Sequence, residues 1–174
     1  MYTEDKKRIM RRYDIIKTNK KQALAQTIGQ SVVLAILTLF CGGVGTGMMI
    51  AAFTETNGFL VLLLVLLFGG LLFWAIPVTV AMFMRRELIS NIAFLRGNYV
   101  FEIDHAAYSV PKTYHGRNGG SSYTLYVTQF EKYGKVELGK PPLMGQEFYV
   151  LATLTKKPRI MDVYPLDKYE IVER

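Results

Sequence analysis

Cysteine and histidine are almost absent from this chain of 174 residues, which contains one cysteine, Cys41, and two histidines, His105 and His115. A single cysteine cannot form an intramolecular disulfide, and two histidines without a neighbouring cysteine do not make a recognisable zinc site. From the sequence alone, no histidine and carboxylate can be placed together beside Ser121 and Ser122. The glycine-rich residues 41–47 lack the Lys-Ser or Lys-Thr of a phosphate-binding loop. We therefore expect no metal, no cofactor and no enzymatic activity.

Charged residues are also missing from two long stretches, one between Lys21 and Glu55 and one between Glu55 and Arg85. A helix needs about 20 apolar residues to cross roughly 30 Å of hydrocarbon. Residues 30–53 and 59–84 both reach that length. The few residues between them include an Asn-Gly pair, which favours a tight reversal of the chain. The pattern predicts a membrane α-helical hairpin of two transmembrane helices.

Two other interpretations of these stretches fit the sequence less well. Two buried helices of a soluble bundle would need polar residues on an outer face, and residues 59–68 have none. A cleaved signal peptide would have a shorter basic region and a shorter apolar core, and a second apolar stretch would not follow at once.

Basic residues lie asymmetrically around the predicted hairpin. Residues 1–26 hold eight Lys and Arg side chains against three acidic ones, a balance of +5, and Arg85 and Arg86 follow the second span. Because cytoplasmic flanks are rich in Lys and Arg, we expect a multi-pass protein of a bacterial plasma (inner) membrane. Both termini would lie in the cytoplasm, with the basic segment on the anionic lipids of the inner leaflet. Residues 98–174 carry only +1, from ten basic and nine acidic side chains, so we expect no nucleic-acid binding.

Small residues recur every four positions in the first span, although a glycine in a helix costs about 1 kcal/mol relative to alanine. Such a strip lets a second helix approach closely in lipid. A glycine pair in the second span lies as far from Thr56 as the pair in the first, so a hairpin would bring both pairs to one depth. We predict a close crossing within the hairpin, with a contact between copies as the alternative. The predicted helix-packing residues are Gly42, Gly43, Gly47, Ala51, Gly69 and Gly70.

Helical spacing extends on both sides of the hairpin domain, residues 27–86. Residues 1–26 predict a basic amphipathic helix in the cytoplasm, whose face of Ile9, Tyr13 and Ile16 would lie on the inner leaflet or on the next domain. Three glutamines recur every four residues further on. We interpret them as a solvated face, with a polar contact between helices as the alternative; they are Gln22, Gln26 and Gln30.

The second span contains Pro77, which removes a backbone hydrogen bond and predicts a kink. Beyond the span, residues 87–97 keep helical spacing up to Gly97. They predict a juxtamembrane helix that attaches the next domain rigidly.

From residue 98 the hydrophobic period changes to two, and six or seven short runs predict strands. Residues 98–174 are too few to bury two full sheets, so we expect a small meander barrel whose closure hides the strand edges. The strand count, the loop at residues 139–145 and the short final strand resemble a Src-homology-3-like barrel. An oligonucleotide/oligosaccharide-binding barrel and a short sandwich are the alternatives.

Aromatic residues concentrate in this β domain, which holds nine of the eleven tyrosines. The run at residues 146–154 is apolar on both alternating faces, so something covers its second face: the juxtamembrane helix, a neighbouring subunit or a partner peptide. Tyrosine also favours recognition surfaces. The candidate interaction surface comprises Tyr149, Leu151, Tyr123 and Tyr126.

These patterns predict a function only as a class. We expect a non-enzymatic membrane protein in which the hairpin anchors, and can oligomerise, a cytoplasmic β-barrel that binds another membrane or cytoplasmic protein. The alternative is an accessory or pore-forming subunit of a channel or transport complex. A stand-alone transporter is not expected, because neither span contains a charged residue or a histidine.

Overall fold

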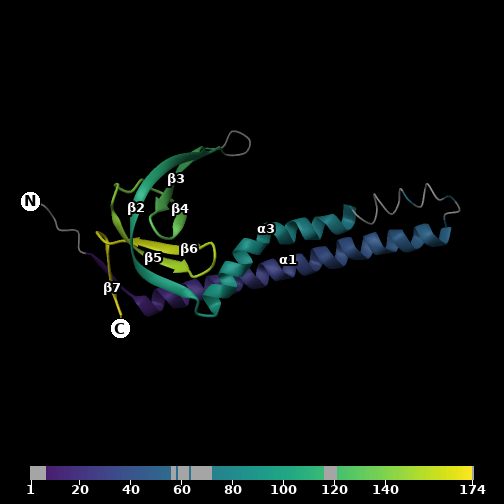
Figure 1. Ribbon diagram of the computed structural model, residues 1–174, viewed down its shortest axis with the longest axis horizontal. Helices are drawn as coiled ribbons and strands as arrows, with labels where there is room; N and C mark the ends of the chain where they lie inside the picture. Colours follow the sequence, from purple (N-terminus) through teal and green to yellow (C-terminus); the bar gives the residue numbers. More distant parts are fainter. Residues whose placement is uncertain (1–6, 56–57, 59–62, 64–71, 116–120, 174) are drawn as a thin grey trace, which may run out of the picture. The chain divides into compact units, whose positions relative to one another are not determined.

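The computed structural model describes residues 7–55, 58, 63, 72–115 and 121–173 (Figure 1). These residues fall into two compact units. The β unit contains the residues up to Ala23 and from Ile92 onward, and the helical unit contains Leu24–Asn91. The elements in chain order are β1 (Arg8–Arg11), α1 (Arg12–Glu55), α3 (Leu72–Leu95), β2 (Tyr99–Tyr114), β3 (Tyr123–Phe130), β4 (Gly134–Leu138), β5 (Glu147–Thr153), β6 (Ile160–Pro165) and β7 (Tyr169–Val172).

The long apolar helix predicted for the first span is α1, which runs for 44 residues. No proline interrupts it, and three of its threonines bond back to carbonyls four residues earlier, as Thr46 Oγ1 does to the Gly42 carbonyl at 2.7 Å. Among the described residues, one helix is long and apolar enough to cross a membrane, within Arg12–Ala51. The long apolar helix is therefore confirmed.

The second predicted span is described only in part. α3 covers its second half and contains Pro77, where the expected kink stays a prediction. Thr56 and Asn57 of the predicted turn, and most of residues 59–71, lie outside the described residues. The two-helix membrane hairpin therefore remains a prediction.

The end of α3 follows the sequence closely. Gly97 has a φ of 90°, a backbone conformation that glycine adopts without strain. The N–H of Gly97 donates to the Phe94 carbonyl at 3.1 Å and the N–H of Asn98 to the Ala93 carbonyl at 2.9 Å, which caps the helix. The predicted end of the juxtamembrane helix at Gly97 is confirmed.

The β unit contains an antiparallel sheet of five strands in the order β4-β3-β2-β5-β6. The sheet curls into a half-barrel (Figure 1). The predicted small β domain is confirmed, but the described strands do not close it, because β4 and β6 remain edge strands.

One long strand, β2, replaces two predicted short ones. Its first half pairs with β5, from Tyr99 to His105, and its second half pairs with β3, from Ala106 to Tyr114. The register shifts between Ala106 and Tyr108, where the partner changes. A β-bulge bends a strand without ending it, so β2 serves both halves of the curled sheet.

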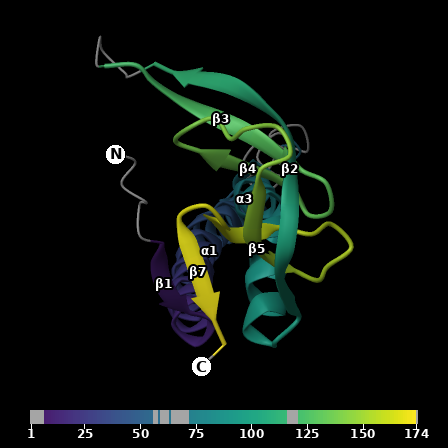
Figure 2. The ribbon, with the colours of Figure 1, turned by 90° about the vertical axis from the view of Figure 1, so that its left-hand side faces the viewer.

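The N-terminal residues differ from the prediction of a helix over residues 1–26. Arg8–Arg11 form strand β1, which pairs in parallel with β7, and Figure 2 shows the two side by side. The helix begins only at Arg12. Local sequence could not reveal this pairing, because Arg8 lies opposite Tyr169, at the other end of the chain.

Two apolar clusters lie on opposite faces of β5, which explains why both of its faces are apolar. One face contributes Phe148, Val150 and Ala152 to a cluster that also contains Phe130. On the other face Leu151 is fully buried against residues of α1 and α3, namely Ile15, Ala23 and Phe94. The cover is thus the end of α3 together with the start of α1.

The predicted face of Ile9, Tyr13 and Ile16 is not the one that packs on the sheet. Ile9, which belongs to β1, and Tyr13 are 67% and 64% exposed, and Ile16 is half-buried. The alternative location of this face, on the inner leaflet, stays a prediction. The buried face contains Ile15, Asn19 and Ala23 instead. The spacing of apolar residues did not indicate this buried face, because the residue at its centre, Asn19, is polar.

A buried polar network keeps that residue in place. Asn19 Nδ2 donates to the Ile15 carbonyl and to Asp162 Oδ2 of β6, both at 3.1 Å. The same carboxylate accepts from the Tyr164 hydroxyl and, through Oδ1, from the Val163 N–H at 3.0 Å. A buried amide with its partners satisfied anchors α1 to the sheet and fixes its rotation.

Candidate functional site

A groove of about 430 Å³ lies at the open end of the half-barrel, and we call it the mouth groove. Its walls come from four places in the chain: the end of β4 with the loop after it, the start of β5, the end of β6, and the turn into β7. The lining residues are Leu138, Gly139, Lys140, Pro141, Pro142, Gln146, Phe148, Val163, Tyr164, Pro165, Lys168 and Tyr169.

Prolines and aromatic rings shape the groove. Pro141 and Pro142 have no N–H to donate and hold the loop after β4 extended, so their rings present apolar surface. The groove reaches the core at Phe148, whose ring meets the Phe130 ring edge-on at 5.3 Å. On another side Tyr164 and Tyr169 form an edge-on pair at 5.4 Å.

Gln146 ties the two loops of the groove together. Its Oε1 accepts the Leu143 N–H at 3.1 Å, and its Nε2 donates to Asp167 Oδ1 at 3.3 Å. The intervening Gly145 has a φ of 78°, a conformation that side chains rarely adopt. The loop at residues 139–145 is thus fastened to the turn between β6 and β7, and the groove is preformed.

The charges at the groove favour an anionic ligand. Lys140 and Lys168 are exposed and line it. The Tyr164 hydroxyl donates its hydrogen bond to Asp162. Burial, the larger cause, and this hydrogen bond, the second, raise the pKa of Tyr164 above its ordinary value. None of the lining residues that the structure describes is a serine, cysteine or histidine. The arrangement is suited to binding through apolar surface and cationic edges.

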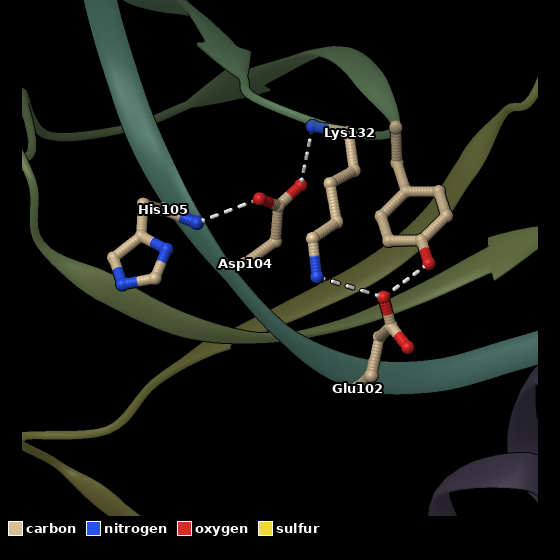
Figure 3. A network of polar contacts seen from close by, with 5 residues as sticks. Glu102, Asp104, His105 and Lys132 are labelled. Atoms are coloured by element: carbon tan, nitrogen blue, oxygen red, sulfur yellow. Dashed lines mark hydrogen bonds and ion pairs between the residues drawn. The ribbon is translucent and has the colours of Figure 1, made fainter.

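A second polar cluster lies near the bulge of β2, where Asp104, His105 and Glu131 bring potential metal-ligand atoms within 4.8 Å of one another. Asp104 is fully buried. Figure 3 shows its two oxygens accepting backbone N–H groups, from His105 at 2.8 Å and from Lys132 at 3.0 Å. Because both oxygens hold backbone donors, we assign this carboxylate a structural role at the turn between β3 and β4.

Two neighbouring side-chain hydrogen bonds join the same turn to Glu102 of β2. Glu102 accepts from the Tyr133 hydroxyl and from Lys132 Nζ, the latter at 3.2 Å (Figure 3). Burial and then the Glu102 bond raise the pKa of Tyr133 to about 12. The bonds from Tyr133 and then Lys132 lower the pKa of Glu102.

The structure does not bring the four predicted interaction residues together. Leu151 is fully buried and belongs to the core. Tyr149 and Tyr126 are half-buried and lie opposite Ile103 and Pro111 of β2. Eight residues of strand separate those two positions by up to roughly 26 Å. Only Tyr123 is well exposed, at 58%, and it stacks on Tyr114.

Sequence reasoning missed the mouth groove residues. The Pro-Pro pair after β4, which follows a cationic Lys140, was a local signal that could have indicated a recognition surface. The other lining residues come from separate strands, and no spacing in the sequence relates them.

In the helical unit, one of the predicted glycines packs closely. A Cβ on Gly42 would lie 3.2 Å from the indole of Trp74 in α3. A Cβ on Gly43 or Gly47 would meet no described atom within 4 Å, and Ala51 is exposed. Gly69 and Gly70 lie outside the described residues, so the crossing predicted there is not tested.

Two of the three predicted glutamines join the helices. Gln26 Oε1 accepts from Asn91 Nδ2 at 3.3 Å, and Gln30 Nε2 donates to Glu87 Oε2 at 2.9 Å. The interpretation as a solvated face was therefore wrong for these two. A polar contact between α1 and α3, the alternative, is what the structure has.

No family model, curated protein or solved structure is detectably similar to this chain. The functional conclusion therefore depends on the geometry described above.

Proposed function

We propose that this chain is a non-enzymatic integral membrane protein of the bacterial inner membrane. In this proposal a two-helix hairpin anchors a small cytoplasmic β domain of the Src-homology-3-like type, and the mouth groove of that domain binds an extended segment of another protein. The single observation that carries the proposal is the mouth groove itself, a preformed apolar hollow between two lysines.

Exposed apolar side chains on the helices support the membrane anchor. Leu39 and Phe40 of α1 are 78% and 69% exposed, and Phe83 of α3 is 82% exposed. Only 17% of the most apolar window of α1 is buried within the protein, whereas the core helix of a soluble protein would be mostly buried. In lipid these side chains would face hydrocarbon, which removes the cost of their exposure to water.

The basic flanks support the orientation. Eight Lys and Arg side chains precede the first apolar stretch, and Arg85 and Arg86 follow the second. The β unit contains residues from before α1 and after α3, so one domain would hold both ends of the chain on one side of the membrane.

The chemistry of the groove defines the partner by class. Proline and aromatic walls favour an extended peptide with apolar side chains, because such a segment places alternate side chains in one hollow. Lys140 and Lys168 favour acidic residues beside them. We propose a partner segment that alternates apolar and acidic residues.

The test uses the full chain in lipid nanodiscs and two fluorescent peptides that alternate leucine with either glutamate or lysine. The acidic peptide should bind, and the basic peptide should not. The double variant Lys140→Glu/Lys168→Glu should lose roughly tenfold in affinity for the acidic peptide at low salt, because attraction becomes repulsion.

The matched control is Lys156→Glu/Lys157→Glu, which makes the same charge change in the exposed turn at the far end of β5 and β6. It should change affinity less than about twofold. Equal losses in both double variants would mean that the peptide binds by overall charge, and the groove would not be the site.

One observation favours the second candidate, a subunit of an oligomeric channel or transport complex. The strip of Gly43, Gly47 and Ala51 is exposed on α1. Helix backbones approach closely at such strips in lipid, so we propose contact between copies there. Crosslinking in native membranes tests it: closed rings of fixed number would favour a pore, and monomers or dimers would favour the anchored binding domain.

A further inference from the structure

A second hollow, of about 350 Å³, lies within the helical unit between α1 and α3, and we call it the interhelical groove. Its polar end contains Gln30 and Ser31 of α1 and Arg85 of α3. Its walls are otherwise apolar and include Leu34 and Val78. Nothing in the proposed function uses this groove.

The groove changes from polar to apolar in one direction on both helices. The bonds from Gln26 to Asn91 and from Gln30 to Glu87 show that rising numbers on α1 meet falling numbers on α3. Leu34 lies one turn beyond Gln30, and Val78 lies two turns before Arg85, so one end of the groove is apolar on both helices. The other end contains the polar side chains together with Leu88. A groove with a charged head and an apolar body matches an amphiphile with a phosphate head and an acyl chain.

The polar end also contains an unsatisfied acceptor. Gln30 uses its Nε2 on Glu87, but its Oε1 is buried and finds no hydrogen-bond partner among the described residues. A buried acceptor without a donor is unfavourable. The oxygen is enclosed, so a small shift of the side chains around it would be needed before a hydroxyl group of a ligand could supply the donor. The phosphate of the same ligand would pair with Arg85.

We propose that the interhelical groove binds one anionic phospholipid whose headgroup carries hydroxyls, of the phosphatidylglycerol type. The phosphate lies at Arg85, a headgroup hydroxyl donates to Gln30 Oε1, and an acyl chain follows Leu34 and Val78. The inference rests on the proposed membrane location. It adds a specific lipid site to it, distinct from general attraction of the basic flanks to anionic lipid.

Native mass spectrometry of the full chain in a neutral detergent tests this site by counting bound lipids. Phosphatidylglycerol should bind at one per chain and about tenfold more tightly than phosphatidylcholine, which lacks both the net charge and the hydroxyl donors. Glycerol 3-phosphate, which lacks the acyl chain, should not bind at the same concentration. Equal binding of phosphatidylcholine, or binding of glycerol 3-phosphate alone, would overturn the proposal.

Arg85 and Arg86 provide a matched pair of variants. Both are exposed arginines on α3, but only Arg85 lines the groove. Arg85→Gln should weaken phosphatidylglycerol binding about tenfold, and Arg86→Gln less than about twofold. Equal effects would show that lipid gathers by charge alone and would overturn the site.

Failure of this inference can be told apart from failure of the proposed function. If the wild-type chain resists carbonate extraction from membranes but binds no lipid selectively, the lipid site in the interhelical groove is wrong and the membrane anchor is not. If carbonate releases the wild-type chain, the proposed membrane anchor is wrong, and so is the lipid site that depends on it.

Discussion

Replacing Leu151 tests how the helices attach to the sheet. Leu151 is fully buried between β5 and the residues Ile15 and Phe94. Leu151→Ala would remove three side-chain carbons and leave a cavity, since α1 and α3 approach from two directions and cannot both collapse into it. Buried leucines truncated to alanine lose about 3 kcal/mol or more. In a unit of this size that loss lowers Tm by roughly 12 to 24 °C.

Hydrogen exchange on the full chain in detergent measures this loss locally. Amides of β5 and β6 that exchange through unfolding of the β unit should exchange about 100-fold faster in Leu151→Ala, as 3 kcal/mol predicts. The control is Leu154→Ala, the same truncation just beyond β5 at a side chain that is 58% exposed. It should change exchange less than about threefold. Similar acceleration in both variants, or none in Leu151→Ala, would refute the packing described for this face.

Three further predictions concern single side chains. Asn19→Ala should destabilise the β unit by about 1 to 3 kcal/mol in the same exchange assay, because the half-buried carboxylate of Asp162 loses a donor; Asn19→Asp should be worse. Tyr133 has a pKa raised from 10.0 to about 12, so the folded chain favours the neutral phenol. Its stabilisation is complete below pH 10 and is lost as the pH rises to about 12; Tyr133→Phe should remove that alkaline loss in urea titrations. Gly42→Leu should lower the thermal stability of the helices in detergent, because its side chain meets the Trp74 indole. Gly43→Leu separates the two predicted contacts of the glycine strip: a loss of monomer stability would support the crossing within the hairpin, and a loss confined to an oligomer would locate a contact between copies at Gly43.

The strands were predictable because their signal is local. Alternation in residues 98–174 located the runs that became β2 to β7, and the end of α3 at Gly97 follows from the glycine alone. The bulge in β2 could not be predicted from the sequence, because a turn and a bulge interrupt the alternation of apolar and polar residues in the same way. Closure was expected from size, but β4 and β6 remain edge strands, and the mouth groove is lined in part by their ends.

The parts that could not be predicted depend on partners far apart in the chain. Strand β1 contains two arginines and forms only because β7 pairs with it in parallel. Asn19 is buried because Asp162 receives its amide. Gln30 contacts Glu87 across the helix pair. On an isolated helix Asn19 and Gln30 would be solvated, and only their tertiary partners make their burial favourable.

Labelling of single cysteines shows directly whether a membrane anchor holds the β unit in the cytoplasm. Cys41→Ser removes the sole cysteine, after which Lys156→Cys places a thiol on the exposed turn of the β unit and Asn57→Cys places one in the predicted turn between the spans. A maleimide that cannot cross membranes is added to intact spheroplasts. We expect Asn57→Cys to be labelled at once and Lys156→Cys to be labelled only after the membrane is permeabilised. Labelling of Lys156→Cys from outside, with Asn57→Cys protected, would contradict this expectation.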